Sequence, residues 1–284
     1  MIVVTGATGQ LGHLVIAALL KKMPASKIVA AVRNVEKAKD LEAMCVQIRY
    51  ADYNKPETWD TALKGAERVL LISSSEIGQR ARQHRSVIDA AKRAGVKLLA
   101  YTSVLHADTS PLGLAAEHRD TEAMLRASGV PYVLLRHSWY TENYTSGVPA
   151  ALAHGAVYGC AGDGRIASAT RADYAEADVA ALTAEDQAGR IHELAGDTSY
   201  TLTELAAEIS RQSGKNIGYV NLPEAEYKNV LLKAGLPEAV AALLADSDTG
   251  VSKGGLFDDG HQLSKLIGRP TTPLATSVAA AMKG

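Results

Sequence analysis

The chain has 284 residues, of which 47% are hydrophobic and 21% are charged, and its formal net charge at pH 7 is -1. This length is enough for one large core with a smaller second lobe, and the composition is that of a globular protein rather than a disordered one. The near balance of acidic and basic residues lacks the basic excess that is typical of nucleic-acid-binding proteins. We therefore expect no nucleic-acid partner.

The sequence predicts neither a membrane span nor secretion. The longest uncharged stretch, residues 143–162, contains Pro149, several glycines and polar side chains, so it cannot form a spanning helix. A strand pattern begins at Ile2, which leaves no room for a signal peptide. Cys45 and Cys160 form no CxxC motif, which favours a reducing compartment without disulfides. We expect a cytoplasmic protein without membrane insertion.

The first half of the chain alternates short β-rich runs with longer helical patterns, a rhythm typical of βαβ units around a parallel sheet. Strands are predicted at residues 2–5, 27–32, 46–51, 68–72, 97–102 and 132–136. Helices are predicted at residues 10–22, 35–43, 56–63, 79–94 and 117–128. The fold class is therefore α/β, with a doubly wound, Rossmann-like parallel sheet whose ligands lie at the carboxyl ends of the strands.

The rhythm breaks after about residue 147 into glycine-rich loops, short strands and clustered helices. Helices are predicted at residues 202–213, 224–234 and 272–283, and a polar loop at residues 246–255. We expect two domains with some exchange of chain between them. Residues 1–146 would form the Rossmann domain, and residues 147–284 would form a smaller α/β lobe on the substrate side.

The motif TGATGQLG at residues 5–12 lies between the first predicted strand and the first predicted helix. Gly6 permits a tight turn, Gly9 lets backbone amides approach a diphosphate, and Gly12 lets the helix pack closely on the sheet. A diphosphate would bind the unpaired amides and the positive dipole end of this helix. The turn could also exist without a ligand, but its position favours dinucleotide binding. The expected contacts are Gly6, Ala7, Thr8, Gly9, Gln10 and Leu11.

The GxxGxxG spacing of this motif resembles the extended and atypical branches of the short-chain dehydrogenase superfamily. Over essentially its full length the chain further resembles the NmrA-like atypical group, which includes NAD(P)H-dependent quinone reductases. The segments that carry this resemblance are TGATGQLG at 5–12, AAVRN at 30–34, LLISSSEIGQRARQHRSVIDAAKRAGVK at 70–97, AYTSVLHADTSPLGLAAEH at 100–118, SATRADYA at 168–175, LAGDTSYTLTELAAE at 194–208 and SKGGLFDD at 252–259.

The end of the second predicted strand distinguishes NAD from NADP, because the adenosine ribose lies there. An NAD enzyme has Asp or Glu at this point, whereas this chain has Arg33, whose guanidinium would pair with a 2′-phosphate. NADPH or NADP is therefore the expected cofactor of residues 1–146. The alternative is that Arg33 only faces solvent and binds no phosphate. Asp52, just past the third strand, could accept the adenine amino group, although a capping role is also open.

The resemblance implies further cofactor contacts after the later strands. Ser73, Ser74 and Ser75 follow the fourth strand and Thr102 follows the fifth, although serines at such places often only cap turns. The segment after the sixth strand would lie along the nicotinamide, or Trp139 would pack as core at a domain junction. Arg171 opens a helix in the second lobe and would lie near the cleft or hold the lobes together. The implied contacts in these two segments are His137, Ser138, Trp139, Tyr140, Thr141, Glu142 and Arg171.

The tyrosine and lysine with which short-chain dehydrogenases protonate a carbonyl are missing from this chain. The family alignment would place them where this chain has His118 and Glu122, which share one helical face. His118 is expected to titrate near neutral pH as a proton donor, or to form a structural ion pair with Glu122 on an exposed helix. Two such residues without HExxH or a cysteine cluster predict no metal site.

The resemblance and the missing tyrosine together predict an NAD(P)H:quinone oxidoreductase that prefers NADPH. A quinone needs a protein acid less than a ketone does, because hydride addition gives a stabilised phenolate that can take its proton from water. We expect direct hydride transfer to a planar acceptor stacked on the nicotinamide, with His118 and Tyr140 as candidate catalytic residues. The candidate walls of the acceptor site are Val104, His106, Trp139, Tyr140 and Tyr144.

Two other functions stay open at this point. The same site would admit other conjugated acceptors, such as triphenylmethane dyes. NmrA-like proteins also include redox sensors that bind NADP(H) without turnover and act on a transcription factor, and the missing tyrosine is compatible with that role. A homodimer is compatible with a Rossmann-type enzyme, but no surface stripe identifies an interface.

Overall fold

The computed structural model describes residues 1–283 and divides into two compact units. Each unit gathers segments that are distant in the sequence. The first unit comprises Met1–Val104, Ala116–His137 and Arg171–His192; the second comprises Leu105–Ala115, Ser138–Thr170 and the chain from Glu193 onward. Within the described residues no helix is both long and apolar enough to cross a membrane.

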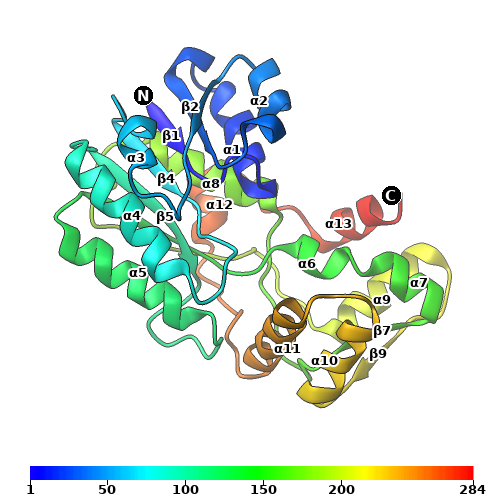
Figure 1. Ribbon diagram of the computed structural model, residues 1–284. Coiled ribbons are helices and arrows are strands. Elements are labelled where there is room, and N and C mark those ends of the chain that lie inside the picture. Colours follow the sequence, from blue (N-terminus) through cyan, green and yellow to red (C-terminus); the bar gives the residue numbers. More distant parts are fainter. Residues whose placement is uncertain (284) are drawn as a thin grey trace. The chain divides into compact units, whose positions relative to one another are not determined.

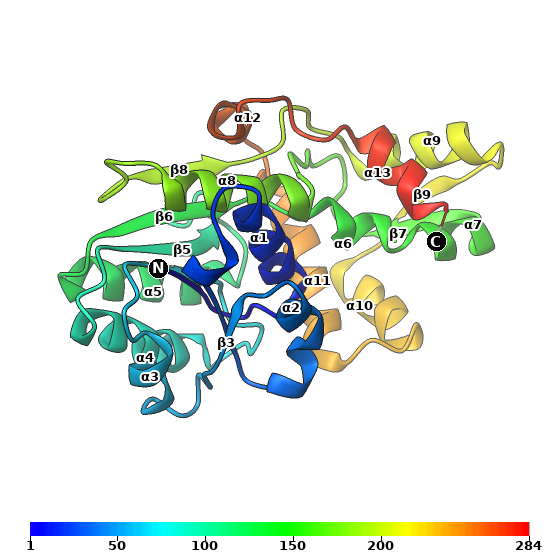
Figure 2. The same cartoon turned by 90° about the horizontal axis from the view of Figure 1, so that it is seen from above.

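The first unit is built on a seven-stranded parallel sheet with the order β3-β2-β1-β4-β5-β6-β8 (Figure 1 and Figure 2). Its strands are β1 (Ile2–Val4), β2 (Ile28–Val32), β3 (Gln47–Tyr50), β4 (Arg68–Leu71), β5 (Leu98–Val104), β6 (Tyr132–His137) and β8 (Ile191–Leu194). The six expected strands and the doubly wound fold are confirmed. The strand order reverses between β1 and β4, which is where such sheets bind ligands.

Helices cover both faces of this sheet (Figure 2). On one face α1 (Gln10–Leu20) packs against α8 (Arg171–Thr183). On the other face lie α3 (Thr58–Ala62), α4 (Arg80–Arg93) and α5 (Ala115–Ser128). The remaining elements of this unit are the short helices η1 (Ala25–Lys27), η2 (Val35–Ala38) and α2 (Lys39–Ala43).

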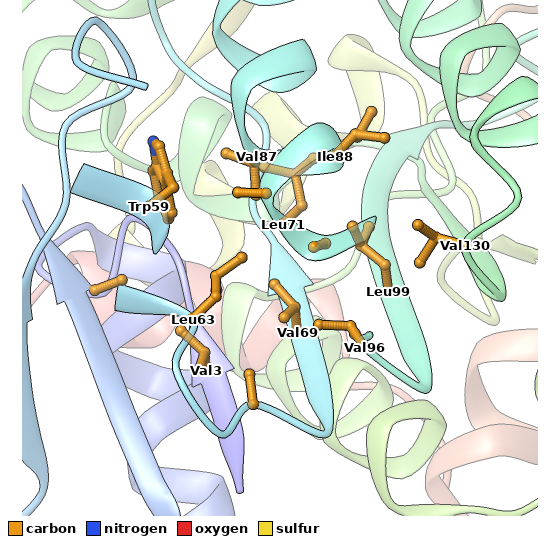
Figure 3. Close-up of a cluster of buried hydrophobic side chains, with 14 of the residues drawn as sticks. Val3, Trp59, Leu63, Val69, Leu71, Val87, Ile88, Val96, Leu99 and Val130 are labelled. Carbon is orange, nitrogen blue, oxygen red and sulfur yellow. The ribbon is translucent and has the colours of Figure 1, made fainter. Parts of the chain in front are cut away.

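The two covered faces explain why the inner strands β1 and β2 are continuous apolar runs instead of alternating ones. Both β1 and β2 are buried at every residue. Figure 3 shows the core on the side of α3 and α4, where apolar side chains of these helices meet those of the sheet. The labelled members of this core are Val3, Trp59, Leu63, Val69, Leu71, Val87, Ile88, Val96, Leu99 and Val130.

The second unit contains a small parallel sheet of β7 (Ala156–Gly159) and β9 (Gly218–Asn221). Its helices are α6 (Thr141–Thr145), α7 (Val148–His154), α9 (Leu202–Ser213), α10 (Glu224–Lys233), α11 (Glu238–Ser252), α12 (Gln262–Ile267) and α13 (Leu274–Ala281). A capping box begins α9, in which Thr201 and Glu204 each bind the backbone amide of the other. Apolar residues from α7, α9, α11, α13 and the segments between them form the core of this unit.

One helix lies in a different unit from the one that the sequence indicated. The helix that opens at Arg171 was expected in the second lobe, but α8 belongs to the first unit. It packs against α1, and Arg68 of β4 donates to the carbonyls of Leu182 and Ala184 at 2.6 and 2.8 Å. The chain thus returns to the Rossmann sheet after the regular alternation of strands and helices has ended, and β8 follows as an edge strand of that sheet.

The prediction of a polar loop at residues 246–255 is wrong, because most of these residues belong to α11. The helix continues to Ser252, and the side chains of Ser247, Asp248 and Val251 are buried. Polar residues inside α11 have partners within the second unit, so their polarity does not indicate exposure. The two cysteines, Cys45 and Cys160, are free thiols, as expected.

Candidate functional site

A tight turn joins β1 to α1 at the carboxyl end of the sheet. Gly6 has a left-handed φ of +57°, which side chains rarely allow. The amide of Gly9 donates to the carbonyl of Gly6 at 2.9 Å and closes the turn. A Cβ on Gly12 would lie 2.4 Å from the Gly6 oxygen and 2.7 Å from the Cα of Ala7. The left-handed φ at position 6 and the close approach of α1 to the turn at position 12 therefore both require glycine.

The amino end of α1 has the properties of an anion-binding site. Its N-cap residue, Gly9, is without a side-chain capping bond, and the first turn of the helix contains no acidic residue. Such backbone amides, aided by the helix dipole, bind phosphate groups. Of the predicted contacts, Gly6, Thr8, Gly9 and Gln10 are exposed, while Ala7 and Leu11 are buried. The exposed backbone of the turn fits a diphosphate.

Arg33 lies directly after β2, where the sequence placed it. Its Nη1 donates to Oε1 of Glu76 at 2.8 Å, a partner that the sequence did not indicate. Asp52 follows β3, and its Oδ1 accepts from the amide of Asn54 at 2.9 Å. The Asp52 carboxylate thus caps a turn in this structure, and its contact with adenine stays a prediction.

The sheet brings together polar residues that follow β4 and lie near the carboxyl end of β5. The amide of Ser73 donates to Oγ1 of Thr102 at 2.9 Å, and the two hydroxyl oxygens are 3.5 Å apart. The side chain of Ser75 is exposed. Ser73 and Thr102 therefore form one polar group at the carboxyl ends of neighbouring strands.

Ser74, in contrast, faces inward. Its amide donates to Nε2 of His84 at 3.0 Å, and its carbonyl accepts from Nε of Arg80 at 2.6 Å. Its hydroxyl bonds to the buried side chain of Gln83. Burial, followed by the charge of Arg80, lowers the pKa of His84 to about 3, which keeps its ring neutral and able to accept. Ser74 therefore anchors the loop after β4 to α4.

The expectation that His118 titrates near neutral pH is wrong. The residue is 4% exposed, and its Nδ1 lies 2.7 Å from the hydroxyl of Tyr101. Its Nε2 lies 3.5 Å from Nη1 of Arg80. Burial, followed by the positive charge of Arg80, holds the pKa of His118 well below its ordinary value. His118 is therefore a neutral ring within a buried polar network.

The alternative ion pair between His118 and Glu122 on an exposed helix is also wrong, because both residues are buried. Glu122 instead accepts two bonds from Arg136, from Nε at 2.9 Å and from Nη2 at 2.7 Å. Ser103 and Arg126 donate to the same carboxylate at 2.6 and 2.9 Å. Glu122 thus binds the end of β6 to α5.

His137, the last residue of β6, is also buried. Its Nε2 lies 2.8 Å from Oδ1 of Asp178, and its ring stacks on Tyr174 with centroids 4.3 Å apart. Both partners lie on α8, the helix that opens at Arg171. The side chain of His137 therefore binds β6 to α8 within the first unit.

The predicted residues after β6 belong to the second unit. Trp139 is partly buried and packs against the core of that unit, so the packing role considered for it is confirmed. Tyr140 forms a backbone bridge with Ala169, and the hydroxyl of Thr141 lies 2.9 Å from that of Ser168. Ser138 is buried and Glu142 is partly buried.

Three of the residues expected to line the acceptor site have contacts that the sequence did not indicate. Val104 is 3% exposed and therefore part of the first unit's core. The hydroxyl of Tyr144 is bonded to Asp248 in α11. The ring of His106 lies between two carboxylates, with Nε2 3.2 Å from Asp258 and Nδ1 3.7 Å from Glu193. His106 also has a left-handed φ of +49°, which the sequence gave no reason to expect.

Sequence reasoning missed the buried charges that fix the strand ends. Arg136 is the penultimate residue of β6 and follows a buried apolar run, which was a signal that a carboxylate must neutralise it. Asp178 lies on the buried side of α8 and had no such signal. Neither partner could be identified from spacing, because each pair joins segments that are distant in the sequence.

A family model described as NAD(P)H-binding matches residues 6–185, a span that begins at the glycine turn and covers more than half of the chain. The chain belongs to this NAD(P)H-binding family. The matched span contains the exposed turn, Arg33 and the paired Ser73 and Thr102. Membership therefore agrees with the residues that the strand-end geometry brings together.

Reductases are prominent among the relatives of this family member. Quinone oxidoreductase 2 of Escherichia coli strain K12 is 60% identical over 98% of both chains. The crystal structure of an NADPH-dependent quinone oxidoreductase from Escherichia coli, complexed with NADPH, gives a TM-score of 0.97 at 59% identity and covers 99% of this chain and 100% of that one. Triphenylmethane reductase of Citrobacter sp., complexed with NADP(H), gives a TM-score of 0.95 at 40% identity with coverage of 99% and 100%.

Proposed function

We propose that this protein reduces quinones with NADPH by direct hydride transfer to a planar acceptor. The observation that carries the proposal is the exposed glycine turn at the start of α1, with Arg33 at the end of the neighbouring strand. The 60% identity to a quinone oxidoreductase over 98% of the chain supports the same function.

The residues of the first unit fit a phosphorylated dinucleotide. The turn amides would bind the diphosphate, and the Arg33 guanidinium would bind a 2′-phosphate. Ser73 and Thr102, joined at the ends of β4 and β5, would contact the ribose on the nicotinamide side. Bound NADPH would supply the hydride from C4 of its nicotinamide.

The chain's own residues would orient the acceptor more than activate it. We assign this orientation to Trp139 and Tyr140, which offer aromatic surfaces directly after β6, and keep His106 and Tyr144 as further candidates. A quinone that has gained a hydride is a stabilised phenolate, and it becomes the hydroquinone by taking one proton from water. The burial and low pKa of His118 argue against it as the donor of that proton.

The test follows NADPH absorbance with and without 1,4-benzoquinone. Oxidation that begins only when the quinone is added is the expected result. Tight NADP binding without acceptor-dependent oxidation would instead indicate a coenzyme-binding sensor. A higher kcat/KM with a triphenylmethane dye than with the quinone would indicate a dye reductase, which the 40% identity to triphenylmethane reductase makes the second candidate.

Arg33→Ala tests the preference for NADPH separately. Loss of one charge-assisted bond should lower kcat/KM for NADPH by about one to two orders of magnitude and leave that for NADH nearly unchanged. Arg93→Ala is the matched control, since it breaks an exposed ion pair with Asp60. An unchanged ratio of kcat/KM between the two coenzymes in Arg33→Ala would contradict the assignment.

A cytoplasmic location and a homodimer stay predictions from the sequence.

A further inference from the structure

An ion pair joins the two loops on either side of the glycine turn. Arg33 follows β2, and Glu76 lies in the loop between β4 and α4. Both β2 and β4 pair with β1, the strand that ends in the turn. Nη1 of Arg33 lies 2.8 Å from Oε1 of Glu76. The pair therefore connects the two strands that flank β1.

Glu76 is fixed in place, whereas Arg33 can change partner. Oε2 of Glu76 accepts from Nε2 of the buried Gln83 at 2.7 Å. The backbone amide of Glu76 donates to Oγ of Ser74 at 3.2 Å. The bonds from Gln83 and then Arg33 lower the pKa of Glu76, so its carboxylate stays charged near neutral pH. The side chain of Arg33 is 65% exposed.

We propose that Glu76 is a specificity-determining residue for the coenzyme: it holds Arg33 in the free protein, and the 2′-phosphate of NADPH displaces it from Arg33. This inference rests on the proposed function. Carboxylate and phosphate are both anions that a guanidinium binds through charge-assisted bonds, so they compete for Arg33. NADH has no 2′-phosphate, so it makes no such exchange and Arg33 stays with Glu76.

The competition has a measurable consequence for affinity. Removing the charge of Glu76 frees Arg33 from its partner and removes an anion beside the phosphate. An exposed ion pair of this kind is weak, so Glu76→Gln should bind NADP about 1.4- to fivefold more tightly. Its affinity for NAD should stay unchanged.

Isothermal titration calorimetry on the full chain at low ionic strength tests this expectation with NADP and NAD. Glu185→Gln is the matched control, because it breaks an exposed pair with Arg68 in the same unit and makes the same change of net charge. It should leave the affinity for both coenzymes unchanged. Thermal unfolding of each variant checks that the fold is retained.

The double variant Arg33→Ala with Glu76→Gln tests whether the effect passes through Arg33. In that background Glu76→Gln should tighten NADP binding clearly less than it does beside an intact Arg33, because only the repulsion between the carboxylate and the phosphate is then removed. Equal tightening without Arg33 would overturn the inference, as would weaker or unchanged NADP binding in the single variant Glu76→Gln. If the wild-type chain itself bound no NADP, the proposed function would fall together with the inference, which distinguishes the two failures.

Discussion

The hydroxyl of Tyr144 donates a hydrogen bond to Oδ1 of Asp248 at 2.9 Å inside the second unit. The other carboxylate oxygen accepts from the amide of Cys160 at 3.1 Å. Asp248 is 3% exposed, and burial raises the pKa of its carboxyl to about 6 although both hydrogen bonds lower it. The folded protein therefore holds this proton more tightly than the unfolded chain does.

This difference in proton affinity makes the stability of the protein depend on pH. The unfolded carboxyl ionises near its ordinary pKa and the folded one near 6, so the contribution of Asp248 is largest in acid and is lost as pH rises between these values. We expect Asp248→Asn to remove this dependence. The difference in free energy of unfolding between wild type and variant should change by about 2 kcal/mol between pH 4.5 and 7.5, in favour of wild type in acid.

Urea denaturation at the two pH values measures this change. Asparagine cannot accept the hydrogen bond from Cys160, but this loss of stability is the same at both pH values and cancels when they are compared. Asp163→Asn is the control, because Asp163 is an exposed carboxyl in the same unit. A difference between wild type and Asp248→Asn that is the same at both pH values would show that the buried carboxyl is not the titrating group.

His118→Gln tests whether the buried imidazole has a structural or a catalytic role. Because the ring contacts Tyr101 and Arg80 and stays neutral, we expect a stability loss of about 1–3 kcal/mol from unsatisfied buried groups. The kcat of the folded variant should stay within about threefold of wild type. A drop of about 100-fold or more, the range for a lost general acid, with normal stability would restore the catalytic hypothesis.

The buried pair of Glu122 and Arg136 should be among the costliest to break. Glu122→Ala leaves the Arg136 guanidinium buried without its carboxylate, so we expect a loss of about 3–5 kcal/mol in the free energy of unfolding. The double variant Glu122→Leu with Arg136→Met removes both charges and should lose much less. Asp60→Ala, which breaks the exposed pair with Arg93, is the control and should lose under about 1 kcal/mol. Similar losses for the buried and exposed single variants would contradict this account.

The part of the fold that could be predicted is the part that local sequence determines. Most of the first six strands are apolar runs, and each is followed by a helix, so the strands, the doubly wound sheet and the glycine turn could be predicted from the sequence, although the strand order was not. The return of α8 and β8 to the first unit could not be predicted, because it depends on packing against α1 and on the bonds from Arg68. The helix α11 was missed because its buried polar residues resemble a loop in sequence.

In the candidate site, too, the positions set by local sequence could be predicted and those set by packing could not. Arg33 and Thr102 could be located because a strand end determines their position. The partners could not be predicted, since Glu76 meets Arg33 only through the order of the strands, and His118 meets Tyr101 only through burial. The sequence indicated which residues could carry chemistry, but burial decided the charge state of His118.

Gly12→Ala tests the close approach of α1 to the turn. The new Cβ would lie 2.4 Å from the carbonyl oxygen of Gly6, so either the turn or the helix must move. We expect a stability loss of about 1–3 kcal/mol from overpacking, together with at least tenfold weaker NADP binding by calorimetry. Gly218→Ala is the control, because a Cβ there meets no atom within 4 Å. Unchanged NADP affinity in Gly12→Ala would show that the turn tolerates the shift.

Tyr140→Leu and Trp139→Phe test the assignment of the segment after β6 to the acceptor. Trp139 also packs against the second unit's core, so phenylalanine is chosen to keep most of that packing, and thermal unfolding checks it. If these rings orient the quinone, KM for 1,4-benzoquinone should rise severalfold, because orientation contributes to productive binding of the acceptor. The affinity for NADP, measured beside it, shows whether the same rings also contact the nicotinamide, as the sequence predicts. Tyr158→Leu, which removes an exposed ring in β7, should leave both quantities unchanged. Wild-type kinetics in both test variants would exclude these residues from the acceptor site and leave Tyr144 and His106 as the remaining candidates.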